Sequence, residues 1–433
     1  MKLHRRTFLL GTAAALSLPS SAFASPKVLR AEHVKAQILP EGDGATDMLG
    51  FNGTTPGPEL RVRQGEVLSL RFENQTDQGS SVHWHGIRLE NAMDGVPGMT
   101  QPLIAPGESF DYRFTAKDAG TFWYHSHNRS WEQVAKGLYG PLIIEETNPP
   151  KVDHDITVML DDWRIEETGA LDGGFGNMHD FAHAGRMGNY AKILPSRETV
   201  RLGERIRLRL INTATARVFP IRIEGLDAKV VALDGMPLTA PRPLEDFQIA
   251  PAQRIDLIGD VTSAVDFLFV LRDDIYEMGK LRIEGEDKVP TAEPIAALAA
   301  PDVLKPKAKP DQSLSLRMEG GAMGGRHQGD DIWAFNGVSG MKEAPLASIK
   351  RGETVEFELI NDTSFAHGIH LHGHHFYELN RDGSLGDLRD TSLIERGASR
   401  KIAVVFDNPG KWLLHCHMLG HQASGMKTWV EVL

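Results

Sequence analysis

The chain has 433 residues, abundant glycine and proline, and a formal net charge of −11. This length predicts two to four domains, and the composition favours a globular, turn-rich, all-β protein. The acidic charge argues against nucleic acid and anionic membrane as partners, and solubility explains it better than attraction of cationic substrates does. The only cysteine, Cys416, excludes an intramolecular disulfide.

The N-terminus is typical of a signal peptide over residues 1–24, with a basic start, an apolar run at 8–18 and an A-x-A cleavage motif at 22–24. The apolar run is too short for a confident membrane span, so no stable membrane anchor is expected. Residues 5–9 resemble the twin-arginine signal, which engages the export machinery for folded proteins, and an ordinary secretory signal is the alternative. Either route predicts a mature protein outside the cytoplasm that begins near Ser25.

Residues 25–148 are predicted to form a first β domain, because short apolar strands alternate with turns such as Asn52-Gly53. Two His-x-His motifs, His83-Trp84-His85 and His125-Ser126-His127, lie in strand-like surroundings. Alternate side chains of a strand share one face, so each motif presents two imidazoles together. Asp94 lies between the motifs in an Asp-Gly pair, which by itself fits a turn.

Residues 149–286 are predicted to form a second β-rich domain, with strands near 156–160 and 205–211. This domain contains no complete ligand motif. Its expected role is to hold the first and third domains in positions that let them share a metal centre. Residues 287–311, rich in Pro, Ala and Lys, are predicted to be a linker.

Residues 312–433 are predicted to form the third domain, which contains His367, His370-Leu371-His372 and His415-Cys416-His417. The last motif follows a buried strand, so Cys416 is expected to face away from its two histidine neighbours. His421 and Met426 follow on a predicted loop. One thiolate, imidazoles and a weak axial thioether make a blue-copper electron-transfer site, with His367 able to supply the second imidazole.

Eight histidines remain once His367 and His421 are set aside, and they suffice for three further copper ions with open positions for oxygen. Four metals that each store one electron match the four electrons needed to reduce dioxygen to water. A single His-x-His motif is more often a pair of core or surface histidines. Four such histidine clusters, in this order along the chain and with the only cysteine in the last of them, argue against interpreting them as ordinary core or surface histidines. The eight are His83, His85, His125, His127, His370, His372, His415 and His417.

These motifs resemble those of the multicopper oxidases, a family that includes laccases, bilirubin oxidases and periplasmic cuprous oxidases of bacteria. The resemblance covers about residue 28 to the end. It implies three consecutive cupredoxin-like Greek-key β-sandwich domains and a periplasmic enzyme with four coppers. Such an enzyme couples one-electron oxidation of Cu(I) or a small phenolic or aromatic reductant to reduction of dioxygen to water.

The resemblance also implies a role for each motif residue. Cys416 and its histidine neighbours would form the electron path, and Asp94 would help to supply protons. The implied type 1 copper ligands are His367, Cys416, His421 and Met426. The implied type 2 ligands are His83 and His370. The implied type 3 ligands are His85, His125, His127, His372, His415 and His417.

The sequence departs from relatives at two positions. Gly368 stands where many relatives have proline, supplies no ligand and is expected to matter little. Gln422 stands where some relatives have an acidic residue that assists proton delivery, which leaves the proton route open. Of His374 and His375, one is expected in the core and one on the surface.

Substrate choice between Cu(I) and phenols is left open by the sequence. Two glycine-rich segments hold thioethers and imidazoles, which suit Cu(I), and related cuprous oxidases carry methionine-rich inserts. The enrichment here is thin, so loop residues without a metal role explain it equally well. The segments contain Met178, His179, His183 and Met187, and Met318, Met323 and His327.

Two other functions fit parts of the pattern. A copper-free cupredoxin-like binding protein, such as a cell-division factor of this architecture, would have lost the ligand motifs, whereas all of them are present here. A copper nitrite reductase would have two domains and lack the full set of eight cluster histidines.

Overall fold

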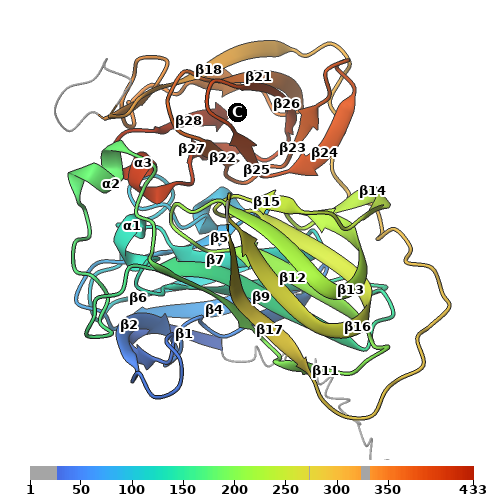
Figure 1. Cartoon of the computed structure of the whole chain (residues 1–433). Helices are drawn as coiled ribbons and strands as arrows, with labels where there is room; N and C mark the ends of the chain where they lie inside the picture. The colour runs from blue at the N-terminus through green and yellow to red at the C-terminus, as the bar shows by residue number, and fades with distance from the viewer. Residues whose placement is uncertain (1–26, 273, 323–331) are drawn as a thin grey trace, which may run out of the picture.

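The protein is described here from a computed structural model that covers residues 27–272, 274–322 and 332–433. The predicted signal peptide, Met323 and His327 lie outside these residues. Strands dominate, and the chain forms three consecutive cupredoxin-like β-sandwiches, so the predicted all-β fold is confirmed (Figure 1). Among the described residues, no helix is both long and apolar enough to cross a bilayer.

The first third of the chain folds into two four-stranded sheets, ordered β2-β1-β4-β6 and β3-β8-β7-β5. Alternating burial along β4 reflects a strand with one face in the core. In the second sheet β5 and β7 run antiparallel, and His83 pairs directly with His125. The elements are β1 (Lys27–Ala36), β2 (Thr46–Phe51), β3 (Leu60–Arg63), β4 (Val67–Asn74), β5 (Val82–His85), the 3-10 helix η1 (Asn91–Met93), β6 (Ser109–Thr115), β7 (Gly120–Ser126), α1 (Ser130–Gln133) and β8 (Tyr139–Glu145).

The middle third forms a nine-stranded sheet around two long strands, β13 and β16, and lies below the C-terminal third in Figure 1. Register shifts within β13 mark β-bulges, which bend the strand. The elements are β9 (His154–Trp163), α2 (Met178–Ala182), β10 (Tyr190–Pro195), β11 (Thr199–Val200), β12 (Arg205–Asn212), β13 (Phe219–Leu233), β14 (Met236–Pro243), β15 (Phe247–Ile249), β16 (Arg254–Val270) and β17 (Ile275–Ile283).

The last third forms a six-stranded and a five-stranded sheet. In the five-stranded sheet β22 pairs with β27, which sets His370 opposite His415 and Ile369 opposite Cys416. The elements are β18 (Gln312–Gly320), β19 (Trp333–Phe335), β20 (Ala347–Ile349), β21 (Glu353–Asn361), β22 (His367–Leu371), β23 (Phe376–Leu379), β24 (Leu385–Arg389), β25 (Thr391–Ile394), β26 (Ser399–Phe406), β27 (Gly410–Cys416), α3 (Leu419–Ala423) and β28 (Lys427–Val432).

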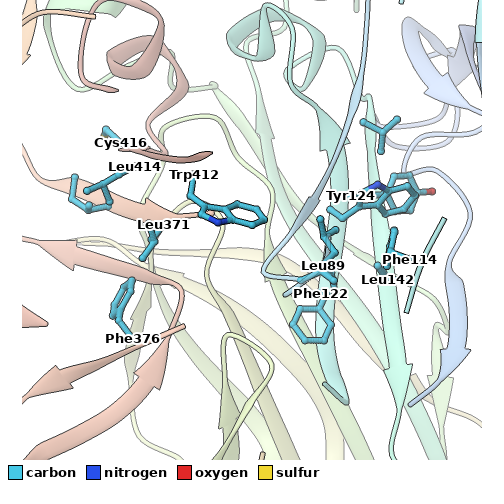
Figure 2. Close-up of a cluster of buried hydrophobic side chains, with 14 of the residues drawn as sticks. Leu89, Phe114, Phe122, Tyr124, Leu142, Leu371, Phe376, Trp412, Leu414 and Cys416 are labelled. Carbon is cyan, nitrogen blue, oxygen red and sulfur yellow. The ribbon is translucent and has the colours of Figure 1, made fainter. Parts of the chain in front are cut away.

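A continuous apolar core joins the first and last sandwiches. Trp412 of β27 lies between Leu371 and Phe376 of its own sandwich and Leu89 and Phe122 of the first (Figure 2). All five side chains are buried. Burial of apolar surface is the main stabilising contribution to folding, so this shared core holds the N-terminal and C-terminal histidine motifs face to face.

Three sequence-based expectations about local structure are wrong. His421 lies on the short helix α3 rather than on a loop, and Gly425, at φ +123°, follows this helix. Met318 is a fully buried residue of strand β18, so it is not available at a surface loop. His374 and His375 are both buried, because the turn that contains them packs inward.

Candidate metal centre

Eight buried imidazoles converge where the first and last sandwiches meet. They come from β5, from the ends of β7 and β22, and from the end of β27. Their ring nitrogens form sets of three that lie within 4.8 Å of one another and could hold a metal ion. The sets are His85, His125 and His417; His127, His372 and His415; and His83, His85 and His370.

Backbone and carboxylate acceptors fix the tautomer of five of these rings. An acceptor oxygen requires an N–H on the facing nitrogen, so Nδ1 carries the proton and Nε2 keeps its lone pair. Four of the five rings donate from Nδ1–H to a backbone carbonyl: His83 to Asp94 O (2.8 Å), His125 to Ser126 O (2.9 Å), His370 to Asp390 O (2.9 Å) and His415 to Cys416 O (2.8 Å). The fifth, His372, donates from Nδ1–H to the carboxylate oxygen Oδ2 of Asp94 (2.9 Å).

The lone pairs released in this way point into the cluster without partners. Nε2 of His83, His125 and His370 is buried and accepts no hydrogen bond. Nε2 of His372 lies 3.1 Å from Nε2 of His415, although neither carries a proton. Two facing lone pairs repel unless a cation lies beside them, so the arrangement fits metal ions held at the centre.

His85 is oriented in the opposite sense. Its Nε2 lies 3.2 Å from Asp390 Oδ1, while its Nδ1 is the buried, unpartnered atom. The carboxylate therefore fixes the orientation of this imidazole, as hydrogen-bond partners of metal-binding histidines commonly do. Asp390 is a site residue that sequence reasoning missed, because a single aspartate far from any motif carries no signal.

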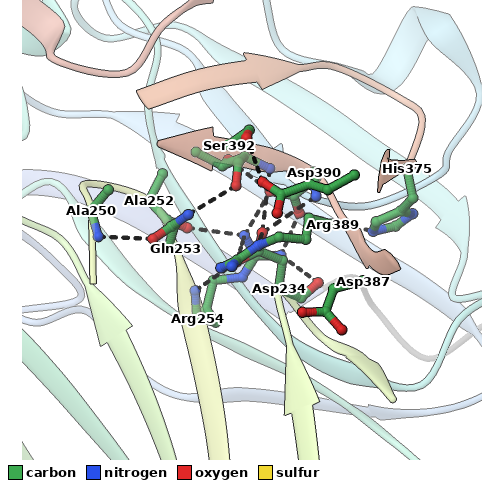
Figure 3. Close-up of polar contacts among 12 residues, drawn as sticks. Asp234, Ala250, Ala252, Gln253, Arg254, His375, Asp387, Arg389, Asp390 and Ser392 are labelled. Carbon is green, nitrogen blue, oxygen red and sulfur yellow. Dashed lines mark hydrogen bonds and ion pairs between the residues drawn. The ribbon is translucent and has the colours of Figure 1, made fainter. Parts of the chain in front are cut away.

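Asp390 is itself held by a buried cation from the middle sandwich (Figure 3). Arg254 of β16 donates to both Asp390 oxygens, to the Thr121 carbonyl of the first sandwich and to the Asp234 carbonyl. Burial alone would raise the pKa of Asp390, but Arg254 and His85 together hold it well below its usual value. The middle sandwich thus contributes a positioning group and no ligand.

A separate set of three ligand atoms lies on the other face of β27. Cys416 Sγ lies 3.6 Å from His367 Nδ1 and 3.8 Å from His421 Nδ1, and all three residues are fully buried. Burial raises the pKa of the Cys416 thiol to about 12. A thiolate here therefore requires a cation to replace the proton, as a copper ion does.

A thioether close to this set comes from a residue that the sequence reasoning passed over. Met418 Sδ lies 3.7 Å from Cys416 Sγ and accepts a hydrogen bond of 3.1 Å from the Gly368 amide. A proline at 368 has no N–H to donate, so this hydrogen bond requires a residue other than proline there. Met426 is buried, its carbonyl accepts from Cys416 N at 3.0 Å, and its axial role stays a prediction.

Cys416 and the two histidines beside it connect the two metal sites. His415 belongs to one cluster set and His417 to another, while Cys416 faces His367 and His421. The Cys416 set and the histidine cluster are therefore joined by the peptide bonds between Cys416 and its two neighbours. Strand alternation predicts this arrangement, because adjacent side chains point to opposite faces.

A surface cavity of about 300 Å³ is lined in part by one cluster histidine. His127 and Gln422 both line it, and Ser130 Oγ lies 3.4 Å from Gln422 Oε1. The neutral amide at 422 therefore lines the same cavity as a cluster histidine, where it can orient water but cannot exchange a proton as a carboxylic acid does.

Burial of so many imidazoles makes the metal-free protein sensitive to acid. Burial lowers the pKa of His375 to about 4 and that of His374 to about 3, and holds several cluster histidines well below 6.5. Histidines of the unfolded chain have an ordinary pKa of about 6.5, so below that pH the unfolded chain binds more protons than the folded protein. The free energy of unfolding therefore decreases as the pH falls below about 6.5.

The expected result is a urea midpoint of the apoprotein that falls steeply between pH 6.5 and 5.5. Each depressed histidine lowers the free energy of unfolding by up to about 1.4 kcal/mol per pH unit in this window. Between pH 8.5 and 7.5 the midpoint should hardly change. An equal change of the urea midpoint per pH unit in the two pH ranges would contradict the assignment of neutral, buried imidazoles.

Comparison with known proteins identifies the family to which the chain belongs. Profiles described as multicopper oxidase match residues 33–149, 155–284 and 308–433. The crystal structure of Lac15 from a marine microbial metagenome is 52% identical, with a TM-score of 0.82, 94% of this chain covered and 100% of that chain. A multi-copper oxidase from Pseudomonas thermotolerans is 32% identical, with a TM-score of 0.83 and coverages of 94% and 99%.

A curated relative from Pseudomonas syringae, copper resistance protein A, is 27% identical over 546 residues that cover 89% of each chain. The similarity to these proteins spans all three sandwiches, and both metal-ligand sets lie within the matched ranges. The chain therefore belongs to the multicopper oxidase family, a group of copper-dependent oxidoreductases.

Proposed function

We propose that this protein is a four-copper oxidase whose type 1 copper is held by His367, Cys416, His421 and Met426. The type 2 ion would take His83 and His370, and the type 3 pair would take His85, His125, His127, His372, His415 and His417. One observation carries this assignment. In these buried imidazoles the inner ring nitrogens face one another with their lone pairs, while the outer nitrogens are already hydrogen-bonded.

In the proposed mechanism, bound copper supplies one-electron storage and oxygen chemistry. Cys416 would connect the type 1 ion to the cluster through its covalent bonds to His415 and His417. Asp94 orients His83 and His372 through its carbonyl and carboxylate, and lies where it can hold a proton needed to form water. The cluster histidines are buried, which would limit contact between bulk water and the oxygen chemistry that bound copper would supply.

Asp94→Asn tests the role of that carboxylate. The amide keeps the size of the side chain but loses the charge that His372 Nδ1–H faces and the ability to transfer a proton. Loss of such a group typically lowers activity by about 10- to 100-fold. We expect kcat for oxygen uptake to fall by this factor with four coppers still bound. An unchanged kcat at full copper content would remove the proton role. The matched control is Asp118→Asn, a buried aspartate whose two oxygens accept from Arg88 and not from a cluster histidine.

We infer that the chain divides into domains at 25–148, 149–286 and 312–433, joined by a linker at 287–311, and that residues 1–24 direct twin-arginine export to the periplasm. The proposed reducing substrate is Cu(I) or a small phenol. The relative named for copper resistance favours a role in copper tolerance. A copper-free binding protein is not favoured, because every predicted ligand is retained.

The direct test is copper content together with oxygen uptake by the mature protein, with Cu(I) and a simple phenol as donors. Four coppers per chain and four donor electrons consumed per dioxygen, without release of hydrogen peroxide, are expected. Faster uptake with Cu(I) would support copper tolerance, and faster uptake with the phenol a laccase-like role. One copper per chain, or peroxide as the product, would overturn the four-copper proposal.

A further inference from the structure

The proposed type 1 set has a second sulfur beside it that is not one of the predicted ligands. Met418 Sδ lies 3.7 Å from Cys416 Sγ, and both side chains are buried. Met418 is also the N-cap residue of α3, and its carbonyl accepts from His421 N at 2.9 Å and from Gln422 N at 3.1 Å. The start of this helix therefore fixes the thioether beside the cysteine.

One backbone amide faces these two sulfurs. Strand β27 ends at Cys416, and the next residue, His417, donates from its amide to the Gly368 carbonyl at 2.6 Å. Two antiparallel residues bonded in this way normally exchange both bonds, so the Gly368 N–H would return to a carbonyl of its partner. Here that N–H donates to Met418 Sδ at 3.1 Å instead. A thioether thus takes the place of a backbone oxygen where the strand pairing ends.

The two imidazoles of the set are oriented as copper ligands and not as donors to sulfur. His421 Nε2 donates to the His183 carbonyl at 2.6 Å, so its Nδ1, which lies 3.8 Å from Cys416 Sγ, keeps a lone pair. His367 Nε2 is occupied by Thr363 Oγ1 at 2.7 Å, and its Nδ1 lies 3.6 Å from the same sulfur. Hydrogen bonds to the two sulfurs are therefore left to backbone N–H groups.

The Gly368 amide acts on the cysteine as well as on the thioether. Burial raises the pKa of the Cys416 thiol, and the amides of Met418 and Gly368 act against that rise because they stabilise the thiolate. The Gly368 N–H therefore has two acceptors within reach, Met418 Sδ and Cys416 Sγ. A single hydrogen is shared between them, so a stronger bond to the thioether leaves a weaker bond to the thiolate.

Resting on the proposed type 1 site, we propose that the Gly368 amide raises the reduction potential of this site and that Met418 lowers it by competing for the same hydrogen. Reduction adds one electron from the donor, with no bond formed or broken and no proton moved. The reduced site is more negative by one charge, so an N–H beside the thiolate stabilises it more than the oxidised site. Gly368 and Met418 are thus positioning residues that decide which donors can reduce the site.

Three substitutions separate the parts of this proposal. Gly368→Pro removes the N–H, and it costs no bond of the sheet because this N–H donates to sulfur. Gly368→Ala is the matched control, since it keeps the N–H and its Cβ would lie 3.7 Å from the Pro251 carbonyl oxygen and 3.8 Å from Met418 Sδ, which is ordinary contact. Met418→Leu removes the competing acceptor at nearly constant volume.

The measurement is the ratio of reduced to oxidised type 1 site, read from the blue absorption of the copper-loaded protein in one fixed mixture of hexacyanoferrate(II) and hexacyanoferrate(III). We expect the ratio to fall about tenfold in Gly368→Pro, which corresponds to about 59 mV for one electron. It should rise several-fold in Met418→Leu and match the wild type in Gly368→Ala. The double variant should match Gly368→Pro, because Met418 has nothing to compete for once the N–H is gone.

Two results would overturn the proposal. One is an unchanged ratio in Gly368→Pro, and the other is an equal effect of Met418→Leu with and without the N–H, which would mean that the thioether acts on the ion directly. If Gly368→Pro does not fold, a ratio that fails to rise in Met418→Leu overturns the competition. A wild type without blue absorption would overturn the proposed type 1 site itself, whereas a blue wild type with unshifted variants would overturn only the role of the amide.

Discussion

Cys416→Ser is expected to abolish both the blue absorption and the oxidase activity of the copper-loaded protein. The blue colour of such sites arises from the copper–thiolate bond, and a serine hydroxyl is not ionised at neutral pH, so the proposed type 1 site would lose its thiolate ligand. The same residue is the start of the covalent path to His415 and His417, so electrons would no longer reach the cluster. Visible absorption and oxygen uptake measure the two effects separately.

Met418→Leu is the matched control for this variant. It removes the thioether that lies 3.7 Å from Cys416 Sγ but leaves the thiolate in place. The control should keep its blue colour, with a shifted band if Met418 influences the copper. A Cys416→Ser protein that stayed blue or kept its oxygen uptake would refute the assignment of the type 1 site.

Arg254→Met is expected to produce the largest loss of stability of any single substitution discussed here. The guanidinium is fully buried and donates to groups of all three sandwiches, Asp390 among them. Removal of one partner of a buried ion pair leaves an uncompensated charge and typically costs about 3–5 kcal/mol. Methionine fills much of the volume, so most of the loss should be electrostatic. Urea unfolding of the apoprotein measures it.

The same variant should also bind less cluster copper, because Asp390 loses the cation that holds it beside His85. The control is Arg222→Met, whose ion pair with Asp246 lies on the surface. Exposed pairs typically contribute less than about 1 kcal/mol, so this control should unfold close to wild type. Similar midpoints for the two variants would show that Arg254 does not hold the sandwiches together.

The ligand motifs could be predicted from the sequence because their geometry is local. The two members of each His-x-His motif are two residues apart, so strand alternation alone places both imidazoles on one face. The same argument predicts that Cys416 faces away from His415 and His417, and the structure agrees. The all-β fold followed from composition, turns and the family resemblance, and it is confirmed.

The groups around the ligands could not be predicted, because they depend on long-range packing. Asp390 meets His85 across 305 positions of sequence, and Arg254 meets Asp390 across 136. A lone aspartate or arginine has no spacing that marks it as part of a site. The bond from His421 to the His183 carbonyl is further hidden, because a backbone oxygen has no sequence signature at all.

The cluster also differs from the type 1 site in how the chain assembles it. Each set of three cluster nitrogens combines histidines from the first sandwich with histidines from the last. A nascent chain that has completed only its N-terminal third therefore carries half-sites, which cannot enclose a redox-active ion. The oxygen-reducing centre comes into existence only when the two ends of the chain meet, so the order of synthesis itself delays the most reactive chemistry until folding is complete.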